Sequence, residues 1–259
     1  MRNWSAQSLL WSEEFADHHA GKLSEDTWNF DLGDGSAAGL VGWGNNELEY
    51  YTKDSLHIDN DLVITAQRIP EDSGLQCYYG PAQWKSGKIH TAGKIGFKYG
   101  RLEIKAKMPS GTGTWPALWL LGANLLDGVA WPHCGEIDIL EHVGYDPGVL
   151  HASVHTKAFN HMINTQKTAT ALVDKWDTEF HLYRIDWTPD YIRAFVDNKQ
   201  FFEFKNTRSG WEQWPFNRKQ HILMNLAIGG NWGGIKGVDD TIFPHKFQID
   251  YVRVYAMNP

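Results

Sequence analysis

Cysteine, charge and long apolar runs are all scarce in this sequence. Cys77 and Cys134 are the only cysteines among 259 residues, too few for the disulfide scaffold of a small secreted domain. The spacing alone leaves open whether they pair. Charged residues make up 21 % of the chain and aromatic residues 14 %, whereas disordered chains are rich in charge and poor in aromatics. No stretch of about 18 apolar residues occurs, so the sequence predicts no membrane-spanning helix.

Positive charge is the scarcer sign. The chain has 24 Lys and Arg against 31 Asp and Glu, a formal net charge of −7, and its basic residues form no cluster. Nucleic acid binding needs clustered Lys and Arg, so we expect no nucleic acid partner and favour a neutral ligand. The N-terminus lacks the basic start and apolar core of a signal peptide, which fits either a cytosolic protein or a mature chain.

Tryptophan and glycine are abundant, with 13 and 25 residues, and the dominant pattern is an alternation of period two. In residues 100–108, Leu102 and Ile104 alternate with Arg101 and Glu103, which is typical of a half-buried strand. No window of about a dozen residues has the period of an amphipathic helix. The sequence therefore predicts a single all-β domain over residues 1–259, a sandwich or barrel. Further strands are expected at residues 62–66, 150–155, 180–187, 191–196, 201–205, 221–228 and 248–255.

Three carboxylates occur close together in residues 131–144. Glu136 and Asp138 are two residues apart, so a strand places both on one face. Glu141 has the wrong parity for that face, and a single β-bulge at Ile139-Leu140 would restore it. Neighbouring carboxylates raise the pKa of at least one of them, which supplies a protonated acid beside an ionised base or nucleophile. The alternative interpretation is a solvated acidic strand face.

Aromatic and glycine residues flank this acidic strand, which favours a site that stacks sugar rings, because pyranose faces are apolar and Trp offers a broad rigid surface. Similar residues recur in the segments Gly42-Trp-Gly-Asn-Asn-Glu-Leu-Glu-Tyr-Tyr51, Gly113-Thr-Trp-Pro-Ala-Leu-Trp-Leu-Leu-Gly122, Gly135-Glu-Ile-Asp-Ile-Leu-Glu141, His155-Thr-Lys157, Asn225-Leu-Ala-Ile-Gly-Gly-Asn-Trp232 and Asp250-Tyr-Val-Arg-Val-Tyr255. Together they resemble glycoside hydrolase family 16 from about Trp11 to Tyr255. The six-residue acidic motif is similar to that of the family's laminarinase-like endo-β-1,3-glucanases.

The resemblance implies a fold and three catalytic roles. The fold would be a concanavalin- or lectin-like β-jelly-roll sandwich of two antiparallel sheets with a concave substrate cleft. Glu136 would be the nucleophile of a retaining double displacement, Glu141 the acid/base, and Asp138 the residue that tunes Glu136. Retention needs carboxyl groups about 5–5.5 Å apart, whereas the two Glu Cα atoms on an extended strand would be about 13 Å apart. We expect strand curvature and converging side chains to close that gap.

The resemblance also implies substrate contacts. It places Trp115 and Trp131 in the cleft, whereas Trp119, between two leucines, is expected to pack in the core. Lys88 stands where family members commonly have Arg, so a point charge replaces a bidentate group. Asn46 and Glu47 would contact sugar hydroxyls near the non-reducing end of the substrate. For Asn46 the alternative is a turn residue that satisfies its own backbone. The predicted substrate-binding residues are Asn46, Glu47, Lys88, Trp115, Trp131, His155, Asn225 and Trp232.

A structural calcium ion is expected on the convex face. Family members often bind one there through an Asp at the position of Asp250 and through backbone carbonyls near Glu14 and Asn60, and calcium prefers such oxygen ligands. A zinc site at His151 and His155, four residues apart on a strand, is the less favoured alternative, because no cysteine pair joins them. No cofactor is expected for catalysis.

The sequence thus predicts an endo-acting retaining hydrolase of β-1,3-glucosidic bonds in β-glucans such as laminarin, with mixed-linkage β-1,3-1,4-glucan as a further substrate. One alternative is a non-catalytic β-glucan-binding protein on the same sandwich, although such relatives typically lose one or both catalytic Glu. Others are a transglycosylase or a hydrolase of an agar-type polysaccharide. The resemblance further implies a β-glucan polysaccharide or oligosaccharide partner, no membrane partner, a monomer and an extracellular location.

Overall fold

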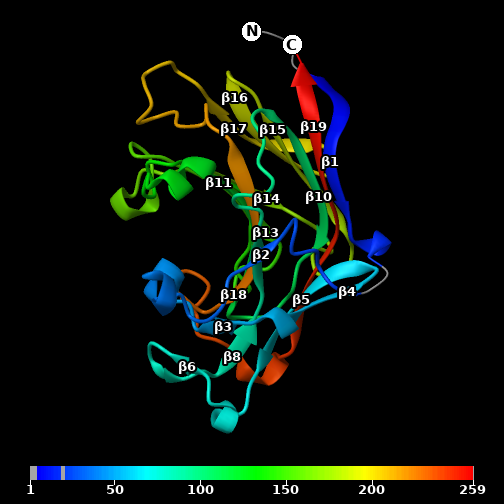
Figure 1. Cartoon of the computed structure of the whole chain (residues 1–259), viewed down its shortest axis with the longest axis vertical. Helices are drawn as coiled ribbons and strands as arrows, with labels where there is room; N and C mark the ends of the chain where they lie inside the picture. The colour runs from blue at the N-terminus through cyan, green and yellow to red at the C-terminus, as the bar shows by residue number, and fades with distance from the viewer. Residues whose placement is uncertain (1–4, 19–20, 259) are drawn as a thin grey trace.

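Two large β-sheets make up the fold in the computed structural model, which describes residues 5–18 and 21–258 (Figure 1). The ten-stranded sheet contains β1 (Ser5–Glu14), β3 (Glu49–Tyr51), β4 (Leu56–Asp59), β5 (Asp61–Arg68), β8 (Trp84–Ser86), β10 (Gly100–Lys107), β15 (His181–Trp187), β16 (Tyr191–Val196), β17 (Lys199–Lys205) and β19 (His245–Asn258). The seven-stranded sheet contains β2 (Asn29–Phe30), β9 (Lys88–His90), β11 (Thr114–Gly122), β12 (Glu136–Glu141), β13 (Val149–His155), β14 (Lys167–Leu172) and β18 (Gln220–Ile228). A small hairpin joins β6 (Gln76–Cys77) to β7 (Gly80–Pro81).

Strands that are distant in the sequence lie side by side in both sheets. The first sheet has the order β17-β16-β15-β10-β19-β5-β8-β3, with β1 paired to β19 and β4 paired to β5. The second has the order β14-β13-β12-β11-β18-β9-β2. The β3–β8 pair is parallel and the other ladders described for these sheets are antiparallel. The predicted jelly-roll sandwich is confirmed.

Helical segments are short and belong to the connections. In the described part of the chain they are all 3-10 helices: η1 (Phe15–Asp17), η2 (Ser36–Ala38), η3 (Val41–Gly44), η4 (Lys53–Ser55), η5 (Glu71–Ser73), η6 (Ala123–Asp127), η7 (His161–Ile163) and η8 (Asp240–Ile242). Over these residues no helix is long and apolar enough to cross a membrane. Loops from both ends of the seven-stranded sheet, with η2 and η3 at one end and η6 at the other, project to the same side (Figure 1).

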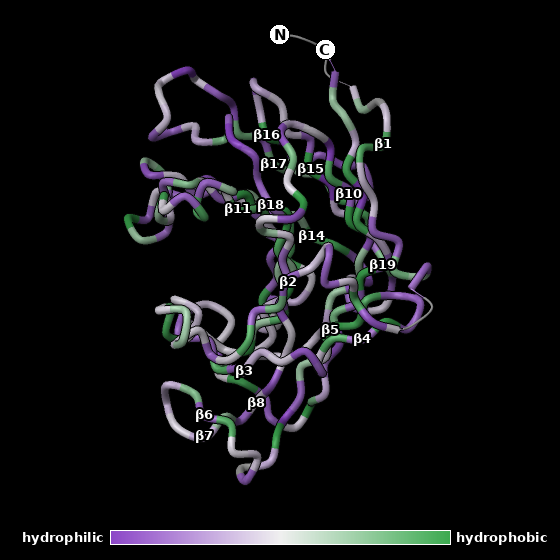
Figure 2. Tube along the Cα trace, in the orientation of Figure 1, coloured by the Kyte–Doolittle hydropathy of each residue, from purple (hydrophilic) through white to green (hydrophobic). Residues whose placement is uncertain are grey.

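The hydrophobic core lies between the two sheets. On β10, Leu102 and Ile104 are fully buried whereas Arg101 and Glu103 are partly exposed, which confirms the period-two prediction for this strand. Figure 2 shows hydrophilic and hydrophobic stretches interspersed along the chain, and β18 in the seven-stranded sheet is buried at all nine positions. One buried cluster contains residues from both sheets, because each sheet turns one apolar face inward.

The structure confirms the predicted hairpin and shows whether the two cysteines are paired. β16 covers residues 191–196 as predicted, and Asp197 and Asn198 have positive φ values of 47° and 66°, as the tight turn into β17 requires. Cys77 and Cys134 are buried free thiols, so they do not form a disulfide.

Candidate active site

A β-bulge on β12 puts its three carboxylates on one face. Leu118 of β11 pairs with Leu140 and Trp119 pairs with Asp138, so Ile139 is the extra residue. The pairing with β13 shifts between Asp138 and Glu141 as well. Ile139 and Leu140 are both buried in the core, which returns Glu141 to the face of Asp138. The bulge is confirmed where the acidic motif predicts it.

Each glutamate of this strand has its own indole donor. The Nε1–H of Trp131 donates to Oε2 of Glu136 at 2.8 Å. The Nε1–H of Trp115 donates to Oε1 of Glu141 at 3.1 Å. The two tryptophans that the resemblance places in the cleft therefore contact the carboxyl groups of the acidic strand directly.

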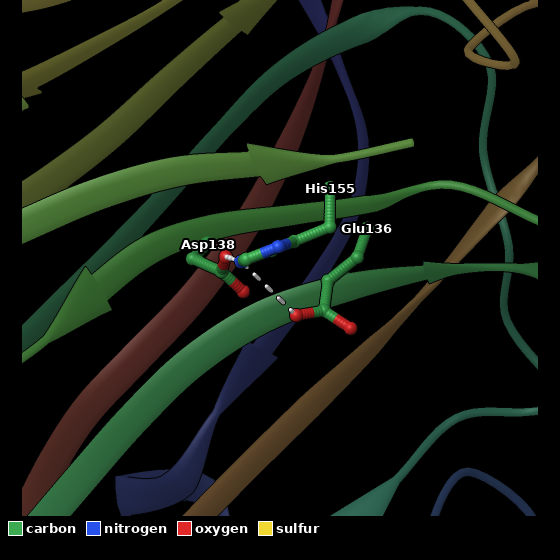
Figure 3. A group of neighbouring side chains, drawn as sticks. All are labelled: Glu136, Asp138 and His155. Atoms are coloured by element: carbon green, nitrogen blue, oxygen red, sulfur yellow. Dashed lines mark ion pairs between the residues drawn. The ribbon is translucent and has the colours of Figure 1, made fainter. Parts of the chain in front are cut away.

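His155 joins the acidic strand from β13 (Figure 3). Its Nε2 lies 3.2 Å from Oδ2 of Asp138 and 3.8 Å from Oε1 of Glu136. All three side chains are shielded from solvent, and Asp138 is only 3 % exposed. The imidazole therefore bridges two of the three carboxyl groups.

Burial governs the protonation of this cluster. Burial raises the pKa of Glu136 to about 8, with the charge of Asp138 as the second cause. Burial also raises the pKa of Asp138 to about 7. For Glu141, burial and then the Asp138 charge hold the pKa well above its usual range. Because desolvation and like charge both favour the neutral acid, the site retains protons at neutral pH.

A hydrogen-bonded chain leads from β11 across β18 to β3. The Nε1–H of Trp119 donates to Oδ1 of Asn225 at 2.8 Å, and Nδ2 of Asn225 donates to the hydroxyl of Tyr51 at 3.2 Å. That hydroxyl donates to Oε2 of Glu47 at 3.3 Å. Trp119 is paired with Asp138 and partly exposed, and it packs against a small buried cluster of Leu121, Cys134 and Leu223 outside the main core between the sheets. Its parity matches that of Trp115, which is the sequence signal that places it on the site face.

Glu47 has a second buried carboxyl beside it. Glu49 is fully buried and its Oε2 accepts the backbone N–H of Ile228 at 2.7 Å. Burial and the Glu47 charge raise the pKa of Glu49 well above its usual range. Burial also raises the pKa of Glu47, but the Lys88 charge and a hydrogen bond from Glu49 oppose that rise. We therefore place a proton on Glu49 and the charge on Glu47. Sequence reasoning found Glu47 and missed Glu49, although the two are two residues apart.

Lys88 lies on β9 in a cage of aromatic and acidic groups. Its Nζ is 3.1 Å from Oδ2 of Asp31, 4.2 Å from the ring centroid of Trp43 and 5.6 Å from that of Trp119. Burial opposes ionisation of Asp31, but the hydrogen bond from His90 and the Lys88 charge lower its pKa to about 2. Asp31 and Trp43 come from distant segments, so no local pattern could have assigned them to this site.

The remaining predicted contacts lie on the loops at the η3 end of the sheet. Nδ2 of Asn46 donates to Oδ1 of Asn231 at 2.8 Å, so this side chain ties two loops together. The Trp232 ring packs edge-on against Trp115 and His151, with centroid distances of 5.5 and 4.8 Å. All eight predicted substrate residues therefore lie close to the seven-stranded sheet. They are on its strands, in the loops beside it, or in the segment that Tyr51 connects to it by a hydrogen bond.

The residues predicted to bind calcium lie on the ten-stranded sheet, on strands other than those of the acidic cluster. Oδ2 of Asp250 pairs with Nζ of Lys105 at 2.7 Å. The Glu14 carboxylate accepts two hydrogen bonds from Arg253, of 2.7 and 2.9 Å. Asn60 lies in the turn between β4 and β5 with a φ of 59°. Carboxylate and carbonyl oxygens fit calcium, and an ion at Asp250 would compete with Lys105.

The two histidines of the alternative zinc site have different neighbours in the structure. His151 packs on Trp232, whereas His155 lies against Asp138. Among the described residues, the group of His, Cys, Asp and Glu whose possible ligand atoms all lie within 4.8 Å of one another is Glu136, Asp138 and His155. That group coincides with the candidate catalytic cluster.

Known proteins share this architecture. The Beta-glucanase of Rhodothermus marinus is 43 % identical over 95 % of this chain and 84 % of its own length. The crystal structure of the laminarinase from Flavobacterium sp. UMI-01 matches with a TM-score of 0.86 and 42 % identity, over 96 % of this chain and 100 % of that one. A crystal structure of SCLam, a non-specific endo-β-1,3(4)-glucanase with an oligosaccharide at its active site, matches with a TM-score of 0.87 and 37 % identity, over 96 % and 94 % of the two chains.

Several other relatives are longer proteins, of which this chain spans 34 to 55 %. The family model described as Glycosyl hydrolases family 16 matches residues 42–253. That range contains β12, its two indole donors and the network from Trp119 to Glu47. The chain belongs to glycosyl hydrolases family 16.

Proposed function

We propose that the protein is an endo-acting, retaining hydrolase of β-1,3-glucosidic bonds in β-glucans such as laminarin. The observation that carries the proposal is the bulged strand β12, on which Glu136 and Glu141 share one face and each accepts an indole N–H. Two carboxyl groups on one face supply the nucleophile and the acid of a double displacement. The β-1,3-glucan class is supported by the name of the SCLam structure, an endo-β-1,3(4)-glucanase, beside a β-glucanase and a laminarinase.

In the first step, Glu136 would attack the anomeric carbon while Glu141 gives its proton to the departing glycosidic oxygen. A raised pKa keeps Glu141 protonated for this step. The hydrogen bond from Trp131 and the proximity of His155 both favour the charged form of Glu136. Because the pKa of Glu136 is the higher of the two, the free site holds the proton of the pair on Glu136, and that proton would pass to Asp138 before Glu136 attacks.

In the second step, water would attack the anomeric carbon of the glycosyl ester at Glu136. Glu141, now a carboxylate, would accept the proton of that water, and the bond between the sugar and Glu136 would break. A sugar hydroxyl in place of water would give transglycosylation. Both outcomes use the same residues, so the ratio of transfer to hydrolysis depends on what binds beside the ester.

Polar and aromatic groups on both sides of β12 favour an endo mode of action. Lys88 and Asn225 lie on β9 and β18 to one side, and His155 lies on β13 to the other. A polysaccharide chain that crosses the strands would therefore contact the protein on both sides of the glycosidic bond that is cleaved. A non-catalytic binding protein is less favoured, because it would have no use for two buried glutamates that each accept a dedicated indole hydrogen bond.

Product analysis on laminarin, lichenan and agarose tests the substrate class. We expect β-1,3-linked oligosaccharides from laminarin, mixed-linkage oligosaccharides from lichenan and no cleavage of agarose. Retention of the β configuration in the first-formed product, followed by NMR, tests the double displacement. Release of agar oligosaccharides, or an α product, would contradict the proposal.

We further infer a structural calcium ion held by Asp250 and by the backbone carbonyls near Glu14 and Asn60, a monomeric state and an extracellular location. The ion would stabilise the ten-stranded sheet and take no part in the chemistry. The location follows from the substrate, because a large polysaccharide is met outside the cell. Size-exclusion chromatography with light scattering and fractionation of the native source test the last two inferences.

A further inference from the structure

Trp211 is an exposed aromatic residue that has no part in the chemistry above. Its surface is 53 % exposed, yet the ring is held on two sides. The His133 ring meets it edge-on at a centroid distance of 5.8 Å, and Nζ of Lys157 lies 5.0 Å from its centroid. An indole that is both accessible and fixed is suited to stacking on a ligand, because little side-chain freedom is left to lose on binding.

The loop that carries Trp211 is attached to the catalytic strand and its neighbour. The backbone N–H of Ala158, just after β13, donates to the carbonyl of Glu212 at 2.9 Å, and the Glu212 carboxylate pairs with Lys157. Pro215 lies against Gly135, the residue before Glu136, so closely that a Cβ there would come within 2.7 Å of Cγ of Pro215. The position of Trp211 is therefore tied to the start of β12 and to the end of β13, which are paired at the same end of the two strands.

Strand order places Trp211 on the leaving-group side of the site. The residues that the resemblance assigns to the non-reducing side, Asn46 and Glu47, connect to β18 and β3, on the β11 side of β12. The contacts of Trp211 are with residues that follow β13, on the opposite side. On the β13 side of the site, the Trp131 ring lies 5.0 Å from the ring of His161, which follows β13, with an interplanar angle of 34°. Flat rings thus extend outward from the indole donor of Glu136.

We propose that Trp211, with His133, Lys157 and Glu212, forms a binding site for the reducing-end part of a β-1,3-glucan chain, beyond the bond that is cleaved. The indole would stack on a pyranose ring, and the polar side chains beside it would bind sugar hydroxyls. Lys157 and Glu212 neutralise each other, which suits an uncharged polysaccharide. The proposal rests on the proposed function and adds a position for the leaving-group side of the substrate.

Laminari-oligosaccharides of increasing length, labelled at the reducing end, test this site. We expect Trp211→Ala to lower kcat/KM about 3- to 10-fold on chains long enough to reach the ring, the range expected for loss of one aromatic contact. The shortest cleaved substrates should be unaffected. In long chains, the preferred cleavage point should move toward the labelled end, because fewer sugars are then held on that side.

Three further variants separate stacking from packing. Trp211→Phe keeps a flat ring and should retain most of the activity on long chains, whereas Trp211→Leu keeps apolar bulk and should lose as much as the alanine variant. Leu126→Ala, on η6 and 61 % exposed, is the matched surface control and should behave like the wild type. Equal losses on short and long chains, or no loss with either Ala or Leu, would overturn the proposal. A wild-type enzyme that does not cleave laminari-oligosaccharides would instead contradict the proposed function.

Discussion

At the scale of single residues, Glu136 and Glu141 are the same amino acid in two different surroundings. Burial raises the pKa of both. Glu136 also has Asp138 beside it as a partner that can take up a proton, and Trp131 and His155 stabilise its charge. Glu141 lies within reach of the Asp138 charge, which disfavours its own ionisation. Both surroundings favour the protonated acid, so the assignment of the nucleophile to Glu136 and of the acid to Glu141 rests on Asp138, which can accept the proton of Glu136, and on the family resemblance.

Glu136→Gln tests the nucleophile. The amide keeps the size of the side chain and a carbonyl that can accept the Trp131 N–H, but it cannot form the glycosyl ester. We expect turnover of laminarin to fall by on the order of a thousandfold or more, while calorimetry still detects binding of a laminari-oligosaccharide. Unchanged turnover in this variant would remove Glu136 from the mechanism.

Glu141→Ala tests the acid/base. Without a proton donor, cleavage of the polysaccharide should be lost by a factor of about 10² to 10⁴. An activated aryl β-glycoside, whose leaving group needs no proton, should still form the glycosyl ester, and added azide should then release a β-glycosyl azide because it needs no general base. The product configuration is read by NMR. An α-azide would indicate an inverting mechanism or exchanged roles of the two glutamates.

At the scale of elements, strand parity predicts much of the site and long-range pairing decides the rest. The i, i+2 spacing of Glu136 and Asp138 predicts their common face, and the parity of Glu141 predicts the bulge at Ile139. The same rule, applied to Trp119 after Trp115, indicates the site face, whereas the flanking leucines favoured the core. Asp31 is different, because it reaches Lys88 only through the pairing of β2 with β9. Such pairing depends on packing across the whole sheet, which no local pattern contains.

The segment around β3 carries a second buried acid pair, and Glu49→Gln tests its protonation. Gln can accept the Ile228 N–H and donate to Glu47, as a protonated Glu49 does. The folded-state pKa of Glu49 is raised above its unfolded value, so its stabilising contribution is complete below the unfolded pKa and is lost as pH rises toward the folded pKa. The wild type should therefore lose stability relative to Glu49→Gln between pH 5 and pH 8. The difference between their free energies of unfolding should shift in favour of the variant.

Urea unfolding at the two pH values measures this difference. Glu49→Ala is the matched control, because it leaves the buried Ile228 N–H without an acceptor and should cost about 1–3 kcal/mol for that group alone. If the Gln variant differs from the wild type by the same amount at both pH values, Glu49 is ionised in the folded protein. A stabilised Ala variant would contradict the hydrogen bond to Ile228.

At the scale of the whole molecule, the two sheets have separate tasks. The seven-stranded sheet carries the acidic strand and its aromatic neighbours, and the ten-stranded sheet closes the core with strands from both ends of the chain, β1 and β19. Period-two alternation was sufficient to predict this class of fold, because each sheet buries one face. The order of the strands was accessible only through the family resemblance, since alternation says nothing about which strands pair.

The proposed calcium ion belongs to this scale, because its ligands would join β19, the β4–β5 turn and the end of β1. Burial and the charge of Asp250 raise the pKa of Asp61, so a bound cation would relieve repulsion between these two carboxylates.

An ion present at about 100 times its Kd adds about 2.7 kcal/mol to the free energy of unfolding, which corresponds to a Tm increase of about 5–10 °C for a chain of this size. We expect a chelator to lower Tm by that amount while activity at 25 °C changes little, and Asp250→Asn to remove the effect of the chelator. Lys105→Met, which takes away the competing ammonium of the Asp250 ion pair, should strengthen calcium binding in calorimetry. An identical Tm with and without chelator would contradict the calcium site and would mean that Asp250 is paired with Lys105 alone.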